Sequence, residues 1–192
     1  ENNTEFLRQT KLLPIFKQSD EFLKPPLVSS CNYDVLVGSP HVYTPLRYNI
    51  YCRHFLCVLD GTVSVKLSPP MNSIYLNEVK DYENLEFRSE INPWSSSPPP
   101  DLHEKVKWVE VTLNPGDTLF IPAYWWHSVK FNTNCLIASY KYHTYMSAVS
   151  VLPQLCVHLL QRQNIRAVLS EKKSVVMTDK NNAKTLSAEI KE

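Results

Sequence analysis

Hydrophobic and polar positions alternate over much of the chain, and this period of two predicts β-strands. The clearest case is residues 63–67, in which three apolar side chains share one face while Ser64 and Lys66 share the other. Asp60-Gly61, a dipeptide typical of tight turns, comes just before this run. A second β-rich run precedes the turn, so we predict a β-hairpin over residues 55–70.

A longer stretch, VTLNPGDTLFIPAYWWHSVKF, combines strand patterns with turn chemistry. Two β-type runs, residues 111–113 and 118–121, are separated by Asn-Pro-Gly-Asp, which is typical of a tight turn. Pro122 ends the second run, because proline cannot donate to a strand ladder. Two tryptophans then lead into His127 and a third alternating run. We predict two strands joined by a tight corner, with His127 delivered from a hydrophobic wall.

The pattern changes at both ends of the chain. Residues 1–30 mix charges with short apolar clusters, and Pro25-Pro26 breaks any helix before it, so we expect an N-terminal wrapper over the β-structure. Residues 143–170 carry leucines at helical spacing and predict C-terminal helices. Residues 171–192 are polar and charged, and we expect a tail there.

Composition narrows the class of protein. The chain has 192 residues, of which 43% are hydrophobic, and this predicts one globular domain. Its net charge of +1 and lack of a long apolar run predict neither a nucleic-acid nor a membrane partner. Five cysteines without a CxxC pair indicate neither a disulfide framework nor a zinc site. We therefore expect an intracellular, reducing compartment, with cytoplasm and nucleus equally compatible.

The stretch from Val111 to Phe131 resembles the last metal-ligand segment of the JmjC/cupin-8 family, the branch that includes the factor-inhibiting-HIF-like hydroxylases. The PGD turn, the Leu-Phe-Ile-Pro run and the Trp-Trp-His triplet carry the resemblance, and residues 37–46 add the Thr-Pro-Leu approach to the first ligands. The resemblance implies an all-β core, a double-stranded β-helix (cupin or jelly-roll barrel), over residues 31–142. Residues 71–107 would be a long insert or lid, with the N-terminal segment and C-terminal helices flanking the barrel.

The resemblance also implies a metal site, and the chain departs from it. Members hold Fe(II) with two histidines and a carboxylate, leaving positions open for 2-oxoglutarate and oxygen. His127 matches the second histidine, but Arg47 and Asn49 stand at the first histidine and the carboxylate. Arginine cannot coordinate a metal, and asparagine lacks the negative charge. The lysine that pairs with 2-oxoglutarate in the family falls at Val63 here.

These departures predict that no metal and no cofactor bind and that no residue is catalytic. At about 4 Å and an effective dielectric near 20, two unit charges repel by roughly 4 kcal/mol, and a guanidinium repels a divalent ion by about twice that. The resemblance places His54 on the interior face of its strand, close to His127. A retained pocket would be lined by Thr44, Arg47, Asn49, His54 and His127.

Three functions remain open from the sequence. The first, which we favour, is a catalytically inactive JmjC/cupin-like domain, a pseudoenzyme that serves as a structural or protein-interaction module. It would have a protein partner or belong to a larger assembly. In relatives, C-terminal helices like these often form a homodimer, so the resemblance implies a homodimer through these helices, unless they only pack onto the outside of the barrel. The second is an Fe(II)/2-oxoglutarate-dependent protein hydroxylase or demethylase with the atypical ligands Asn49 and His127. The third is a barrel that binds an anion or small ligand through Arg47, unless its own side chains fill the barrel.

Overall fold

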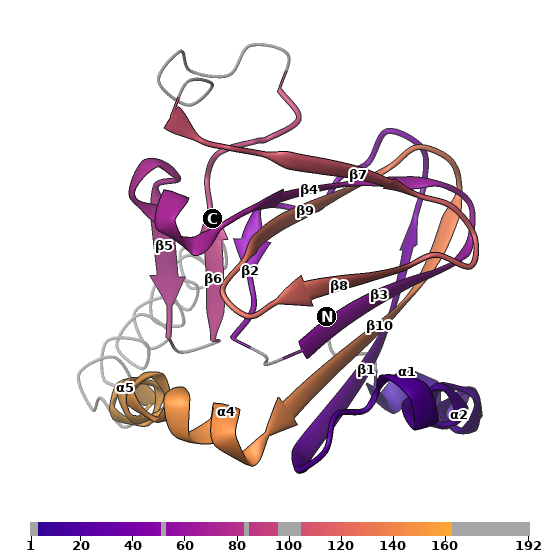
Figure 1. Ribbon diagram of the computed structural model, residues 1–192, viewed down its shortest axis with the longest axis horizontal. Coiled ribbons are helices and arrows are strands. Elements are labelled where there is room, and N and C mark those ends of the chain that lie inside the picture. Colours follow the sequence, from indigo (N-terminus) through magenta and orange to yellow (C-terminus); the bar gives the residue numbers. More distant parts are fainter. Residues whose placement is uncertain (1–3, 51–52, 83–84, 96–104, 163–192) are drawn as a thin grey trace, which may run out of the picture.

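The computed structural model (Figure 1) describes residues 4–50, 53–82, 85–95 and 105–162. Its strands form two antiparallel sheets. The four-stranded sheet runs in the order β1 (Val28–Gly38), β10 (Cys135–Thr144), β3 (Arg53–Asp60) and β8 (Thr118–Pro122). The six-stranded sheet runs in the order β5 (Glu78–Asp81), β6 (Glu86–Ser89), β2 (Arg47–Tyr48), β9 (Trp126–Phe131), β4 (Val63–Ser68) and β7 (Val109–Leu113).

Successive strands cross from one sheet to the other, as they do in a double-stranded β-helix. The chain passes from β3 to β4, from β7 to β8 and from β9 to β10, changing sheet each time. The two sheets face each other across the core (Figure 1). The predicted all-β core and double-stranded β-helix with C-terminal helices are therefore confirmed.

The predicted hairpin over residues 55–70 is wrong in its pairing. Both strands exist, but β3 pairs with β10 and β8, whereas β4 pairs with β9 and β7. Gly61, at φ +78°, packs so closely against the backbone of Asn134 and Cys135 that it leaves no room for a Cβ. The Asp-Gly dipeptide therefore turns the chain from one sheet to the other, because contacts with the β9–β10 turn decide its direction.

The core between the sheets is apolar, and its residues come from alternate positions along the strands. Val63, Val65 and Leu67 of β4 are buried on the inner face, as their spacing predicts. The cluster consists of Leu56, Val58, Val63, Val65, Leu67, Leu113, Ile121, Val129, Phe131, Cys135 and Ile137. These side chains fill most of the barrel, so any polar site must lie toward one end.

The N-terminal helices α1 (Thr4–Gln9) and α2 (Leu13–Leu23) cover the outer face of the four-stranded sheet (Figure 1). Phe16 packs edge-on against Tyr33 and lies 5.2 Å from Tyr140, centroid to centroid. Asp20 accepts hydrogen bonds from the hydroxyls of Tyr33 and Tyr142, the latter at 2.7 Å. One carboxylate thus anchors α2 to two strands of the four-stranded sheet.

At the other end of the chain, β10 leads directly into α4 (Tyr145–Ser150) and α5 (Leu152–Arg162). Thr144 caps α4, because its Oγ1 accepts from the Ser147 backbone N–H at 3.1 Å while the Ser147 hydroxyl accepts from Thr144. Val151, 2% exposed, packs against Ile50 and Phe87. The predicted tail, residues 171–192, lies outside the described residues. Within the described part, no helix combines the length and apolar character needed to cross a membrane.

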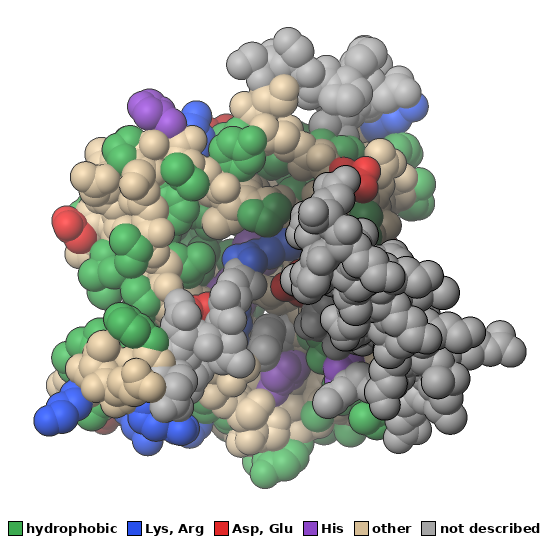
Figure 2. Space-filling model, turned by 180° about the vertical axis from the view of Figure 1, so that it is seen from behind, with side chains coloured by type: hydrophobic (Ala, Val, Ile, Leu, Met, Phe, Trp, Pro, Cys, Tyr) green, Lys and Arg blue, Asp and Glu red, His purple; other side chains and the backbone are tan. Residues whose placement is uncertain are grey.

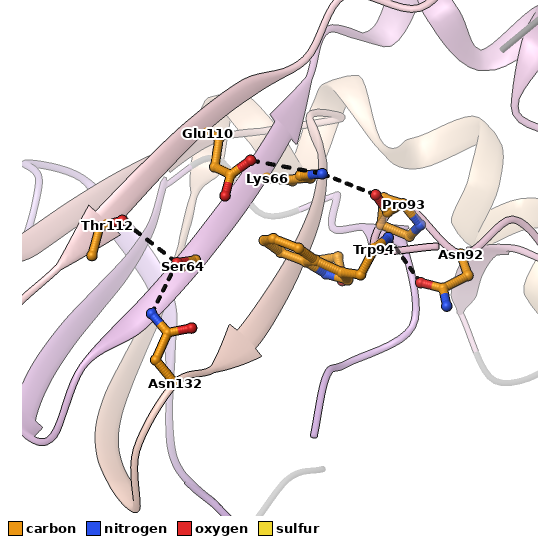
Figure 3. Close-up of polar contacts among 9 residues, drawn as sticks. Ser64, Lys66, Asn92, Pro93, Trp94, Glu110, Thr112 and Asn132 are labelled. Atoms are coloured by element: carbon orange, nitrogen blue, oxygen red, sulfur yellow. Dashed lines mark hydrogen bonds and ion pairs between the residues drawn. The ribbon is translucent and has the colours of Figure 1, made fainter. Parts of the chain in front are cut away.

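The predicted insert, residues 71–107, extends the six-stranded sheet with β5 and β6, after the 3-10 helix η1 (Pro70–Tyr75). Residues 92–94 then lie on the outer face of β4 and β9 (Figure 3). The Trp94 indole N–H donates to the Ser128 hydroxyl at 2.8 Å, and the Lys66 ammonium lies 4.6 Å from the centre of the Trp94 ring. Residues 96–104, where a lid was also expected, are outside the described part.

Candidate functional site

The segment that carries Arg47 runs beside the strand that carries His127. The Thr44 backbone N–H donates to the Val129 carbonyl at 2.8 Å, and the Thr44 hydroxyl accepts from the Val129 N–H at 2.9 Å. Two-residue strand β2 continues this pairing, with Arg47 directly opposite His127 in the antiparallel register. Residues opposite one another in such a pair project to the same face of the sheet. Arg47 therefore stands next to His127, where the resemblance placed a metal-binding histidine.

His54 faces His127 across the barrel. The two ring centroids are 5.5 Å apart with the rings at 67°, and the side chains are 4% and 2% exposed. The Asn49 amide nitrogen lies 3.2 Å from His54 Nδ1, and His54 Nε2 lies 3.0 Å from the Ser139 hydroxyl. An amide nitrogen can only donate, so Nδ1 is the acceptor and Nε2 carries the hydrogen. The structure thus brings Arg47, Asn49, His54 and His127 to one end of the barrel.

The hydrogen bond of His127 fixes its tautomer. Its Nδ1 lies 3.2 Å from the Trp125 carbonyl oxygen, which can only accept, so Nδ1 carries the hydrogen. Nε2 is then a buried acceptor, and it has no hydrogen-bond partner among the described residues. Burial, followed by the nearby charge of Arg47, lowers the pKa of His127 to about 3. Burial also lowers the pKa of His54 well below its usual value, so both imidazoles are neutral at pH 7.

Two cations stand beside these neutral histidines. Burial lowers the pKa of Arg47, and the carboxylate of Glu86 acts in the opposite direction. Lys141 of β10 lies opposite His54 in the strand register. Its pKa is lowered by burial and then by the charge of Arg47, while Asp34 raises it. This end of the barrel therefore sets two cations beside two carboxylates, where the sequence had indicated Arg47 alone.

A cavity of about 490 Å³ opens at this end, and we call it the mouth cavity. It is lined by Ser29, Ser30, Asn32, Tyr33, Asp34, Asn49, Ile50, Leu85, Glu86, Lys141, His143, Ala148, Val151 and Leu155. On the face shown in Figure 2, basic and acidic side chains meet in a hollow near the centre. Of the five predicted pocket residues, Asn49 lines the mouth cavity. Thr44 and Arg47 line a second groove, of about 680 Å³, and the two histidines are buried beside them.

The side chains at the ligand positions do not fit Fe(II). Among the described residues, no group of three or more histidine, cysteine, aspartate or glutamate side chains is placed to hold a metal ion. His127 supplies one nitrogen lone pair, but its neighbour in the register is a guanidinium. Asn49 uses its amide nitrogen on His54 and brings no charge. The family's ligand positions therefore lack both the second imidazole and the anionic oxygen that the metal requires, and both ring nitrogens of the nearby His54 are already hydrogen-bonded, to Asn49 and Ser139.

Comparison with known proteins gives one family and a set of distant relatives. A family model described as a cupin-like domain matches residues 6–148. Lysine-specific demethylase JMJ31 of Arabidopsis thaliana is 32% identical over 115 residues, which cover 58% of this chain and 20% of that protein. HSPB1-associated protein 1 of Homo sapiens is 31% identical over 100 residues, covering 49% of this chain and 20% of that protein. The chain therefore spans about a fifth of the length of these relatives.

A third relative and one solved structure also match. JmjC domain-containing protein D of Dictyostelium discoideum is 35% identical over 98 residues, covering 49% of this chain and 21% of that protein. Among solved structures, hydroquinone 1,2-dioxygenase from Sphingomonas sp. TTNP3 overlaps with a TM-score of 0.39 at 11% identity, covering 60% of this chain and 61% of that chain.

Proposed function

The chain belongs to the cupin-like domain family, and from that premise we propose that it is a catalytically inactive member that serves as a structural or protein-interaction module. One observation carries the proposal: the guanidinium-bearing Arg47 pairs in register with His127, at the place where the resemblance puts the first metal-binding histidine. The proposal assigns no Fe(II) and no 2-oxoglutarate to this chain. One relative is named a lysine-specific demethylase, and we do not carry that activity over to this chain.

Electrostatic repulsion gives a second reason, besides the missing ligands, why a metal ion would not bind at this site. A guanidinium at about 4 Å from a divalent ion costs roughly 8 kcal/mol at an effective dielectric near 20. Lys141 adds a second positive charge that acts on both histidines. One imidazole and one neutral amide cannot offset that repulsion, so a metal would have to displace or neutralise Arg47 before it could bind.

The surface of the C-terminal helices supports an interaction role. Met146, Val149 and Leu160 are 77%, 71% and 69% exposed, so α4 and α5 present an uncovered apolar face within the described residues. Helix α5 carries no acidic or basic side chain other than His158 between Leu152 and Gln161, and Arg162 is its last residue. Two copies of this face can meet around a twofold axis without opposing like charges from those residues. We propose a homodimer through α4 and α5; one relative, HSPB1-associated protein 1, is named for its association with another protein.

Iron binding tests the proposal. Fe(II) is titrated anaerobically into the wild-type chain and into the double variant Arg47→His/Asn49→Asp, and binding is measured by calorimetry. The variant rebuilds the two histidines and carboxylate of the family and serves as the matched positive control. We expect no stoichiometric binding to the wild-type chain and binding to the rebuilt one. Stoichiometric iron on the wild-type chain at micromolar Kd would overturn the proposal.

A third chain, Arg47→Met, tests repulsion by the guanidinium separately from the missing metal ligands, and it is needed if the rebuilt variant folds poorly. Circular dichroism first establishes that each chain is folded, and the titration is repeated with Arg47→Met. This variant removes the guanidinium but supplies no new metal-binding nitrogen. If repulsion and missing ligands both matter, as proposed, Arg47→Met still binds no stoichiometric iron.

A further inference from the structure

Strand β7 forms one edge of the six-stranded sheet, and we propose that a second copy of this chain pairs with it and continues the sheet. Within the described residues β7 pairs with β4 alone, and no further strand lies beyond it (Figure 1). This surface differs from the α4–α5 face. The inference therefore goes beyond the homodimer proposed above, because it gives each chain a second face that recognises its own copy.

The register of the sheet shows which backbone groups of β7 point outward. In β9, the N–H and C=O groups of Val129 bond to Thr44, on the side away from β4. Hydrogen-bonding groups alternate sides along a strand, so residues 64, 66 and 68 of β4 bond to β9 and residues 63, 65 and 67 bond to β7. These face residues 113, 111 and 109 of β7. The N–H and C=O groups of Glu110 and Thr112 are left on the outer side.

Nothing in the sequence of β7 protects this edge from pairing. Edge strands are commonly protected by lysine, proline, a bulge or a very short length. Strand β7 reads VEVTL and pairs with β4 without a register shift. Its one charged side chain, Glu110, lies 3.7 Å from the Lys66 ammonium (Figure 3). The opposite edge of the sheet, β5, reads EVKD and is mostly charged, so β7 is the edge suited to a partner strand.

The strand is complementary to itself about a twofold axis through Val111. In that antiparallel register Glu110 lies opposite Thr112 of the second copy, so each outward N–H meets a C=O group. On the inner face Val109, which is 49% exposed, lies opposite Leu113 of the second copy.

Charge excludes one neighbouring register, because an axis through Glu110 would set the two Glu110 carboxylates opposite each other. An axis through Thr112 avoids that repulsion but pairs fewer residues of the strand. The axis through Val111 therefore uses the edge most fully. Since both this face and the α4–α5 face pair with their own copies, the two together would join dimers into larger assemblies.

Hydrogen exchange of the wild-type chain, followed by NMR, measures the outward amides directly. The amides of Val109 and Val111 are bonded to β4 and should exchange slowly at every protein concentration. The amides of Glu110 and Thr112 should exchange fast in dilute protein. We expect their exchange to slow roughly tenfold between about 0.02 mM and about 1 mM chain, a range suited to a small interface.

Substitutions of Thr112 test the register by the sign of their effects. Thr112→Glu places a carboxylate opposite Glu110 of the second copy and should weaken association roughly tenfold. Thr112→Lys places an ammonium there and should strengthen association by a similar factor. Thr118→Glu and Thr118→Lys are the matched controls, because Thr118 is an exposed threonine on β8, an edge of the other sheet. Sedimentation velocity measures all four in the Leu160→Glu background, so that the α4–α5 face does not contribute.

Glu110→Pro removes an outward N–H but no hydrogen bond to β4, and it should abolish association while the chain stays folded by circular dichroism.

Fast exchange at Glu110 and Thr112 up to about 1 mM chain would overturn the inference. Effects of the same sign for Thr112→Glu and Thr112→Lys would overturn the register. The exchange measurement decides the question even if a variant is unstable, because it needs only the wild-type protein. Leu160→Glu tests the α4–α5 dimer and should leave exchange at Glu110 unchanged, and the iron titration is independent of both, so failure of one proposal is distinguishable from failure of the others.

Discussion

Acid should destabilise this protein through its two buried, neutral histidines. Burial and the charge of Arg47 lower the pKa of His127 from 6.5 to about 3 in the folded state. The unfolded chain takes up a proton near pH 6.5, whereas the folded chain does not until the pH is far lower. The stabilising contribution of neutral His127 is therefore complete above pH 6.5 and is lost as the pH falls from 6.5 toward 3.

The magnitude follows from the difference in bound protons. Below pH 6.5 a single such histidine lowers the free energy of unfolding by up to about 1.4 kcal/mol per pH unit, so His127 accounts for about 2 kcal/mol by pH 5. His54 acts in the same direction, because burial and the charges of His127, Lys141 and Arg47 lower its pKa too. A loss of this size is a large part of the stability of an ordinary domain.

Urea denaturation at pH 7.5, 6.5, 5.5 and 5.0 measures this effect. We expect the free energy of unfolding of wild-type protein to fall over this range, and that of His127→Gln to fall by about 2 kcal/mol less. His41→Asn is the control, because His41 is exposed and its φ of +69° suits asparagine. Parallel pH profiles for wild type and His127→Gln would refute the claim that this histidine is held neutral by burial.

Four further substitutions test the fold and its surface. Gly61→Ala should lower the free energy of unfolding by several kcal/mol, because its Cβ would lie 2.2 Å from a backbone oxygen. Gly116→Ala, also at positive φ but with no atom within 4 Å of its Cβ, should lower it by about 1 kcal/mol. Equal urea midpoints for the two variants would contradict this. Trp94→Phe removes the hydrogen bond to Ser128 and should lower the free energy of unfolding by about 1 kcal/mol, with an unchanged melting curve as the opposing result. Leu160→Glu should shift the chain toward monomer in light scattering, and a dimer of undiminished affinity would exclude the α4–α5 face.

The fold was predictable from the sequence because turn chemistry and alternation agree over most of the barrel. The Asn-Pro-Gly-Asp corner and the apolar face of β4 both lie where the pattern placed them. The strand partners around Asp60-Gly61 were not predictable in the same way, because that turn packs against Asn134 and Cys135, more than 70 residues away in the sequence. Local propensity contains no information about such a contact.

Lys141 and the mouth cavity were missed for a related reason. Strand β10 is covered on both sides, with Tyr140 and Tyr142 under the N-terminal helices and Ser139 and Lys141 facing the barrel. Apolar side chains of β10 therefore face both the barrel interior and the helices, and its polar side chains do not all face solvent. The one available signal was the parity that Lys141 shares with Ser139 and Ile137.

The central claim is that Arg47 stands where a metal ligand would be needed. Its most direct test is the iron content per chain after anaerobic equilibrium dialysis against micromolar Fe(II) with 2-oxoglutarate, for wild type and Arg47→His/Asn49→Asp side by side. The account predicts background iron on the wild-type chain and close to one iron per rebuilt chain. One iron per wild-type chain, lost in His127→Gln, would contradict it.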